Sequence, residues 1–160
     1  MKNKTKFISQ LSIFIALTIV LTLALVIPLP SNGGYLNLSD AMILTSSSIL
    51  GPYGGLIVGA FSGAICDLAS GYAIYAPFTF IIKGIEGFLA GFLLKKFNGI
   101  KTNIISLFIC GILMGILYFI PDLLIYGSSV AIFNLPLNIL QGLVGALISS
   151  LVYIIFLKKH

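Results

Sequence analysis

Residues 53–71 read YGGLIVGAFSGAICDLASG, an apolar stretch in which a glycine or an aspartate recurs at every fourth position: Gly55, Gly59, Gly63, Asp67 and Gly71. A stretch of about 20 apolar residues has the length that crosses a bilayer as a helix. Positions four apart share one helix face, and glycines on that face let a second helix backbone come close. The segment therefore predicts a membrane-spanning helix that packs tightly within a bundle.

The rest of the chain has the same character. Of its 160 residues, 59% are hydrophobic and 8% are charged, and the mean hydropathy is +1.15. A soluble domain needs more polar surface to cover its core, so we expect lipid to be the solvent. The composition predicts an all-α polytopic membrane protein in which residues 1–160 form one transmembrane domain. The net charge of +5 comes from lysines clustered at hydrophobic boundaries, which argues against nucleic-acid binding.

Turn signals divide the chain into six predicted helices. The apolar runs are separated by proline and glycine breaks at Pro28, Gly51-Pro52, Pro77, Gly99 and Gly127. The first run is long for a signal peptide, and no small-residue cleavage site follows it, so it is interpreted as a helix. Pro136 is expected in the first turn of the last helix. The predicted helices are about 7–29, 39–51, 53–71, 76–97, 103–127 and 134–157.

The lysines predict the orientation of these helices. With six crossings, eight lysines fall on one side: Lys2, Lys4, Lys6, Lys95, Lys96, Lys101, Lys158 and Lys159. The positive-inside rule makes that side cytoplasmic, so both termini are expected inside and residues 30–38, 72–75 and 128–133 outside. The helix at 39–51 is short for a span. If it did not cross, five lysines would move outside, so we expect it to cross as a tilted or shielded helix.

Polar side chains gather in the outer half of the predicted bundle. The acidic residues are Asp40, Asp67, Glu86 and Asp122, and Lys83 shares a helix face with Glu86. Ionisable groups at membrane depth are costly unless they are paired or wetted, so each is a candidate functional group. Polar and aromatic groups that converge from several helices build a small-molecule pocket. The predicted substrate-binding residues are Asn37, Asp67, Tyr75, Lys83, Glu86, Tyr118, Asp122, Asn138 and Gln141.

Structural roles compete with this interpretation for several of the residues. Lys83 and Glu86 are equally well explained as an ion pair that neutralises itself inside the bundle. Asp40 is better explained as the N-cap of its helix, and Asn134 as a possible cap of the last helix. Tyr35 and Tyr72 fit an interfacial aromatic belt.

Signals of catalysis are weak in this sequence. No Cys, His and carboxylate set has metal-ligand spacing, and no glycine-rich loop leads into a Lys-Ser or Lys-Thr pair. Cys66 and Cys110 lie in apolar segments, where small apolar filler is the simplest role. The sequence predicts neither an enzyme nor a metal or cofactor site, and active transport would have to draw its energy from another protein.

Three stretches carry a family resemblance. They are residues 34–40, GYLNLSD; residues 50–72, which run from Leu50-Gly51-Pro52 to Ser70-Gly71-Tyr72; and residues 75–87, YAPFTFIIKGIEG. Together they resemble the substrate-binding S components of energy-coupling factor (ECF) vitamin transporters of the riboflavin and hydroxymethylpyrimidine type. The motif-level similarity covers about residues 34–91, and the length and six helices match throughout.

The resemblance implies a protein of the bacterial plasma membrane that captures a vitamin or vitamin precursor at the outer face. It implies three protein partners, a transmembrane T component and two cytoplasmic ATPases. Family members contact the T component through an Ala-x-x-x-Ala motif on the first helix, and the equivalent residues here are Ser12 and Ala16. A flavin, a pyridoxine-type pyridine and hydroxymethylpyrimidine all remain possible ligands. Two other functions remain open, namely a self-sufficient secondary carrier and a membrane-embedded enzyme or assembly factor.

Overall fold

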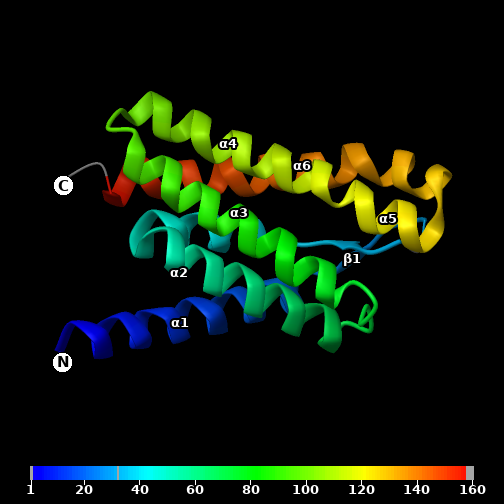
Figure 1. The fold of residues 1–160 in the computed structure, drawn as a ribbon, viewed down its shortest axis with the longest axis horizontal. Helices are drawn as coiled ribbons and strands as arrows, with labels where there is room; N and C mark the ends of the chain where they lie inside the picture. Colours follow the sequence, from blue (N-terminus) through cyan, green and yellow to red (C-terminus); the bar gives the residue numbers. More distant parts are fainter. Residues whose placement is uncertain (1, 32, 158–160) are drawn as a thin grey trace.

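Helices make up nearly all of the computed structural model, which describes residues 2–31 and 33–157 (Figure 1). This confirms the all-α class. Lys158 and Lys159, used above for orientation, lie outside the described residues. The helices are α1 (Lys2–Ala24), α2 (Ser39–Ala69), α3 (Ala76–Lys96), α4 (Ile100–Leu117), α5 (Phe119–Tyr126), α6 (Ser128–Val152) and a terminal π-helical turn, η1 (Tyr153–Leu157). Two short strands, β1 (Ile27–Pro28) and β2 (Tyr35–Leu36), complete the described chain.

Helix α2 is a hairpin with two antiparallel arms. Gly51 has φ 74° and ψ −169°, a conformation that favours glycine, and Pro52 after it cannot donate a backbone hydrogen bond. The arms, residues 39–50 and 52–69, lie against each other, because Gly55 contacts the Ser47 side chain and Gly59 contacts Ile43. The predicted helices 39–51 and 53–71 are therefore present as these two arms, and α2 starts and ends at the same end of the bundle (Figure 1).

The hairpin bears directly on the number of crossings. When both arms of α2 are counted as a single helix, five helical segments of the described chain are long and apolar enough to span a membrane. They are Lys4–Ala24, Ser39–Ala69, Ala76–Lys96, Ile100–Tyr126 and Ser128–Ile155. At 1.5 Å per residue the first arm of α2 rises about 18 Å, less than the roughly 30 Å of a hydrocarbon core. Six crossings thus stay a prediction. Helix α2 returns to the end at which it starts, so Lys4 and Lys101 lie at the same end of the bundle whether or not the first arm crosses. The lysine positions therefore do not decide whether this arm spans the membrane.

Glycines set the closest helix contacts, as their four-residue spacing predicted. The backbones of α2 and α3 touch at Gly55 and Gly87, and a side chain at either glycine would collide with the other. The backbones of α4 and α6 touch in the same way at Gly111 and Gly142. Small residues allow this approach in lipid, where packing takes over from the hydrophobic effect.

Several element boundaries differ from the prediction. Helix α1 stops at Ala24, because Ile27 and Leu36 pair across the β1–β2 hairpin. Helix α6 begins at Ser128, immediately after Gly127 with φ 86°, and not at residue 134. Pro136 therefore lies inside α6 rather than in its first turn, an arrangement that helices in membranes tolerate when neighbours satisfy the freed backbone groups. The predicted helix 103–127 starts at Ile100 and is divided at Tyr118 into α4 and α5.

The β1–β2 hairpin, the turn at residues 70–75 and the α5–α6 turn at Gly127 all lie at the end of the bundle opposite to the start of α1 (Figure 1). We call this the loop end. The start of α1 and the end of η1 lie together at the other end. The three connections at the loop end surround the polar side chains described below.

We predict that Gly142→Leu lowers the thermal unfolding midpoint in detergent. The added side chain would enter the backbone of Gly111, and overpacking a tight contact costs about 1–3 kcal/mol or more. The matched control is Val144→Leu, which places the same side chain two residues away at an exposed position. Equal midpoints for the two variants would contradict the assigned packing of α4 against α6.

Candidate functional site

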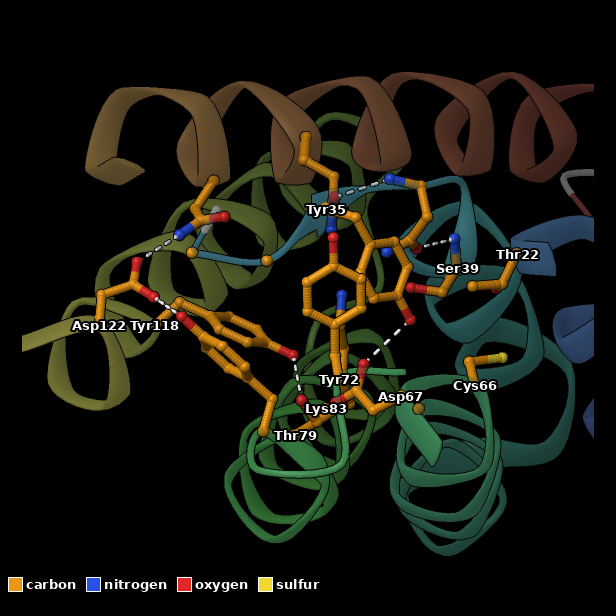
Figure 2. A pocket seen from close by; sticks show the side chains of 17 residues that line it. Thr22, Tyr35, Ser39, Cys66, Asp67, Tyr72, Thr79, Lys83, Tyr118 and Asp122 are labelled. Atoms are coloured by element: carbon orange, nitrogen blue, oxygen red, sulfur yellow. Dashed lines mark hydrogen bonds between the residues drawn. The ribbon is translucent and has the colours of Figure 1, made fainter. Parts of the chain in front are cut away.

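A polar cavity lies near the loop end, between α2, α3, α6 and the connections (Figure 2). The free space between its side chains is small, about 30 Å³. This is room for water but not for a vitamin unless side chains move. The lining combines tyrosines, carboxylates, amides and one lysine: Thr22, Gly33, Gly34, Tyr35, Asn37, Ser39, Gly63, Cys66, Asp67, Tyr72, Tyr75, Thr79, Lys83, Tyr118, Asp122, Asn138 and Gln141.

Asp40 joins three helices directly beneath the cavity. Its Oδ1 accepts a hydrogen bond from the Lys83 ammonium on α3, and its Oδ2 accepts one from Gln141 Nε2 on α6 at 2.6 Å. Gln141 Oε1 in turn accepts the backbone N–H of Asn37 at 2.9 Å. The interpretation of Asp40 as an N-cap is wrong, because Leu38 occupies that position and the Asp40 carboxylate bonds Lys83 and Gln141 instead.

Glu86 is the one predicted site residue that does not line the cavity. Its Oε2 lies 3.9 Å from Lys83 Nζ, farther than Asp40, so Lys83 and Glu86 are not an exclusive pair. Neither carboxyl oxygen of Glu86 has a hydrogen-bond partner among the described residues. Glu86 therefore belongs to the layer beneath the cavity, where two carboxyl groups flank one lysine.

Asp122 is held by three donors from two segments, the turn before α3 and helix α6. Tyr75 donates its hydroxyl to Oδ1 at 2.5 Å, and the amides of Asn134 and Asn138 on α6 donate to Oδ2 at 3.1 and 3.4 Å. Burial and the hydrogen bond to Asp122 raise the pKa of Tyr75, so its hydroxyl stays protonated and donates. Asn134 also donates to the carbonyl of Gly33 at 2.8 Å, so it fixes the loop before β2 and does not cap α6.

Asp67 faces the cavity from the second arm of α2. The Tyr35 hydroxyl donates to its Oδ1 at 2.9 Å, and the rings of Tyr35 and Tyr72 lie with centroids 4.9 Å apart (Figure 2). Burial, reinforced by the charge of Asp67, raises the pKa of Tyr35 and keeps its hydroxyl protonated. Tyr35 and Tyr72 are thus part of the cavity wall rather than an interfacial belt.

Tyr118 forms the wall toward α5. Its hydroxyl is 2.8 Å from that of Thr79, and its ring centroid is 5.8 Å from Lys83 Nζ. The tyrosines thus present ring faces and edges, while the carboxylates, amides and Lys83 present acceptors and donors. Such a set suits a planar polar ligand held by stacking and directed hydrogen bonds.

The cavity brings together eight of the nine predicted site residues, all except Glu86. That they bind a ligand stays a prediction. Sequence reasoning missed the contribution of Tyr35, Tyr72 and Thr79. The sequence carries one signal for the two tyrosines, because Tyr35 and Tyr72 each follow a glycine. In the structure these glycines, Gly34 and Gly71, have positive φ and change the chain direction.

The proposed partner surface on α1 is exposed. Ser12 and Ala16 both face away from the bundle, and the Ser12 hydroxyl donates to the carbonyl of Ile8 within the helix. Thr18 and Thr22 lie on the opposite, buried side of the helix. Within residues 2–31 and 33–157 no three His, Cys, Asp or Glu side chains are placed to share a metal ion.

Comparison with known proteins agrees with this architecture. The chain is 34% identical over 152 residues to the thiamine precursor transporter HmpT of Lactococcus lactis subsp. cremoris, covering 94% of this chain and 87% of that protein. It is 32% identical over 131 residues to an uncharacterized protein of Pyrococcus woesei, covering 82% and 88%. Residues 2–158 match the family model for the ECF-type riboflavin transporter, S component. The chain therefore belongs to the family of ECF-type transporter S components.

Proposed function

We propose that this chain captures a vitamin or vitamin precursor in the cavity at the loop end and hands it over for ATP-driven import. Because the chain belongs to the S-component family, it is a substrate-specific, multi-pass component of a plasma-membrane transporter. The observation that carries the ligand site is the convergence of Lys83, Asp67 and Asp122 with four tyrosines on one buried space. Buried charges are kept in a membrane bundle at a cost, and a ligand with its own donors and acceptors accounts for their presence.

The ligand site is tested by removing the ammonium of Lys83 together with the charge of Asp40, its hydrogen-bonded partner. In the double variant Lys83→Met with Asp40→Asn, residue 40 can keep its bond to Gln141. We expect vitamin affinity to fall about ten- to a hundredfold, because a hydrogen bond to a charged group contributes about 1.5–3 kcal/mol. The ligand is first identified by native mass spectrometry of the purified protein, and its affinity is then measured by calorimetric titration.

Glu86→Gln is the comparison variant for this titration. Glu86 is as deeply buried as Lys83 but does not line the cavity, so its substitution should weaken binding less than the double variant does. If the folded double variant binds the vitamin as tightly as the wild-type protein, Lys83 is structural and the cavity is not the ligand site.

We further propose six crossings, with the loop end outside the cell and both termini in the cytoplasm. The lysines near the other end, Lys4, Lys6, Lys95, Lys96 and Lys101, support this orientation through the positive-inside rule. The short first arm of α2 would then be shielded from lipid by α3 and α6, against which its buried side chains pack.

Cysteine labelling of intact cells tests the orientation. In a background with Cys66 and Cys110 replaced, a membrane-impermeant maleimide should label Ser129→Cys and should label Lys101→Cys only after the cells are opened. Both positions are exposed at opposite ends of the bundle. Labelling of Lys101→Cys from outside would overturn the orientation.

Import should depend on partners that supply energy. We propose that a transmembrane T component contacts α1 at Ser12 and Ala16 and that two ATPases drive the complex. Ala16→Phe should reduce uptake severalfold and leave vitamin affinity unchanged, because a bulky side chain blocks close helix approach. Uptake and binding are measured in proteoliposomes that contain the whole complex.

Leu147→Phe is the control for this experiment, since it enlarges an exposed side chain on α6, away from the proposed contact. It should change neither uptake nor affinity. Accumulation of the vitamin by liposomes that contain this chain alone would instead favour a self-sufficient carrier.

A further inference from the structure

The layer beneath the cavity holds two carboxyl groups and one ammonium group. Asp40 on the first arm of α2 and Glu86 on α3 both lie against Lys83, and Glu86 Oε2 is 3.9 Å from Lys83 Nζ, farther away than Asp40 Oδ1. All three side chains are buried, since Asp40 is 0%, Glu86 1% and Lys83 2% exposed. If both carboxyl groups were ionised, the layer would keep one uncompensated negative charge inside a membrane bundle, which is costly.

The two carboxyl groups differ in their hydrogen bonds. Asp40 accepts one from Lys83 and one from Gln141 Nε2 at 2.6 Å, so each of its oxygens has a donor. Neither oxygen of Glu86 has a partner among the described residues. Hydrogen bonds to a carboxylate favour its charged form, and burial without them disfavours it. Of the two groups, Asp40 is therefore the one that the structure supports as an anion.

The elements packed around Glu86 bring no second cation to it. Within residues 2–31 and 33–157, Lys83 is the one cation within ion-pair distance of Glu86. The second arm of α2 presents backbone at this depth, where Gly59 meets the main chain of Lys83, and α4 contributes the buried thiol of Cys110. Asp67 acts on Lys83 from the cavity wall, which adds negative charge rather than removing it.

We propose that Glu86 is a proton-binding site, whose carboxyl group holds a proton taken from water at neutral pH. Two carboxyl groups that share one site avoid the repulsion of like charges when one of them is protonated. The proton removes the uncompensated charge and leaves Asp40 as the single anion paired with Lys83. The remaining N–H groups of the Lys83 ammonium then stay available to the cavity that it lines. The inference concerns the layer beneath the cavity and does not depend on which ligand the cavity takes.

Infrared spectroscopy tests the protonation state directly. Glu86 is the only glutamate in the chain, so an isotope label marks this one carboxyl group. The full-length protein is made by cell-free synthesis with glutamate that carries ¹³C in its side-chain carboxyl group, and its spectrum at neutral pH is compared with that of the unlabelled protein. We expect the label to shift the C=O stretching band of a neutral carboxylic acid. A shift of the carboxylate stretching bands in its place would overturn the inference.

Two variants of the same layer should behave differently in thermal unfolding in detergent. Glu86→Gln keeps a neutral group of the same shape, so it should not lower the unfolding midpoint at neutral pH. Asp40→Asn is the matched amide substitution, and it should lower the midpoint because it removes the anion that pairs with Lys83. An equal fall for both variants would overturn the inference, since only an ionised Glu86 loses a charge on substitution. The infrared measurement needs no variant, so it decides the matter even if Asp40→Asn fails to fold.

The pH dependence of stability gives a further readout. An ordinary glutamate in the unfolded chain ionises at about pH 4.3, whereas the folded chain keeps the proton on Glu86 at neutral pH. The folded chain then binds one proton more than the unfolded chain, so this contribution to stability falls as the pH rises. Because Glu86→Gln lacks this loss, its midpoint should gain on that of the wild-type protein between about pH 6 and about pH 9. A difference between the two midpoints that stays constant over this range would contradict a proton on Glu86.

Discussion

The carboxylate of Asp40 is the point on which the bundle and its cavity both depend. It takes one hydrogen bond from Lys83 on α3 and another from Gln141 on α6, and Gln141 holds the backbone of Asn37 before α2. A lone charge inside a membrane protein is costly, and removing one partner of a buried pair costs about 3–5 kcal/mol. The contact with Lys83 neutralises the charge of Asp40, and together with the two hydrogen bonds of Gln141 it fixes the relative positions of α2, α3 and α6 beneath the cavity.

The hairpin in α2 makes this contact possible. By reversing at Gly51, the chain places a short first arm between α3 and α6, so that Asp40 reaches a lysine and an amide from two different helices. Glycine completes the fit, since a side chain at Gly145 would collide with Asp40 itself. The close helix packing at Gly145 and the ion pair of Asp40 with Lys83 therefore depend on each other, and together they determine where the cavity lies.

Sequence reasoning could locate the helices and most of the cavity, because both follow from local patterns. Apolar runs, glycine spacing and the depth of Asp67, Lys83 and Asp122 along their helices can be read directly. The errors have a common cause. An aspartate at a helix start is usually a cap and a tyrosine in a loop is usually interfacial, so Asp40 and Tyr35 were assigned by local position. Their actual partners lie 101 and 32 residues away along the chain, in contacts that only the tertiary fold creates.

The small free volume of the cavity has a physical consequence for binding. Its own tyrosines occupy the space, and Tyr35 and Tyr75 donate hydrogen bonds to Asp67 and Asp122. A ligand must then displace aromatic rings and add hydrogen bonds that the tyrosines do not already make. Affinity depends on the difference between these two sets of contacts. Both oxygens of Asp122 accept hydrogen bonds and one oxygen of Asp67 does not, so a donor that entered the cavity would gain more at Asp67 than at Asp122.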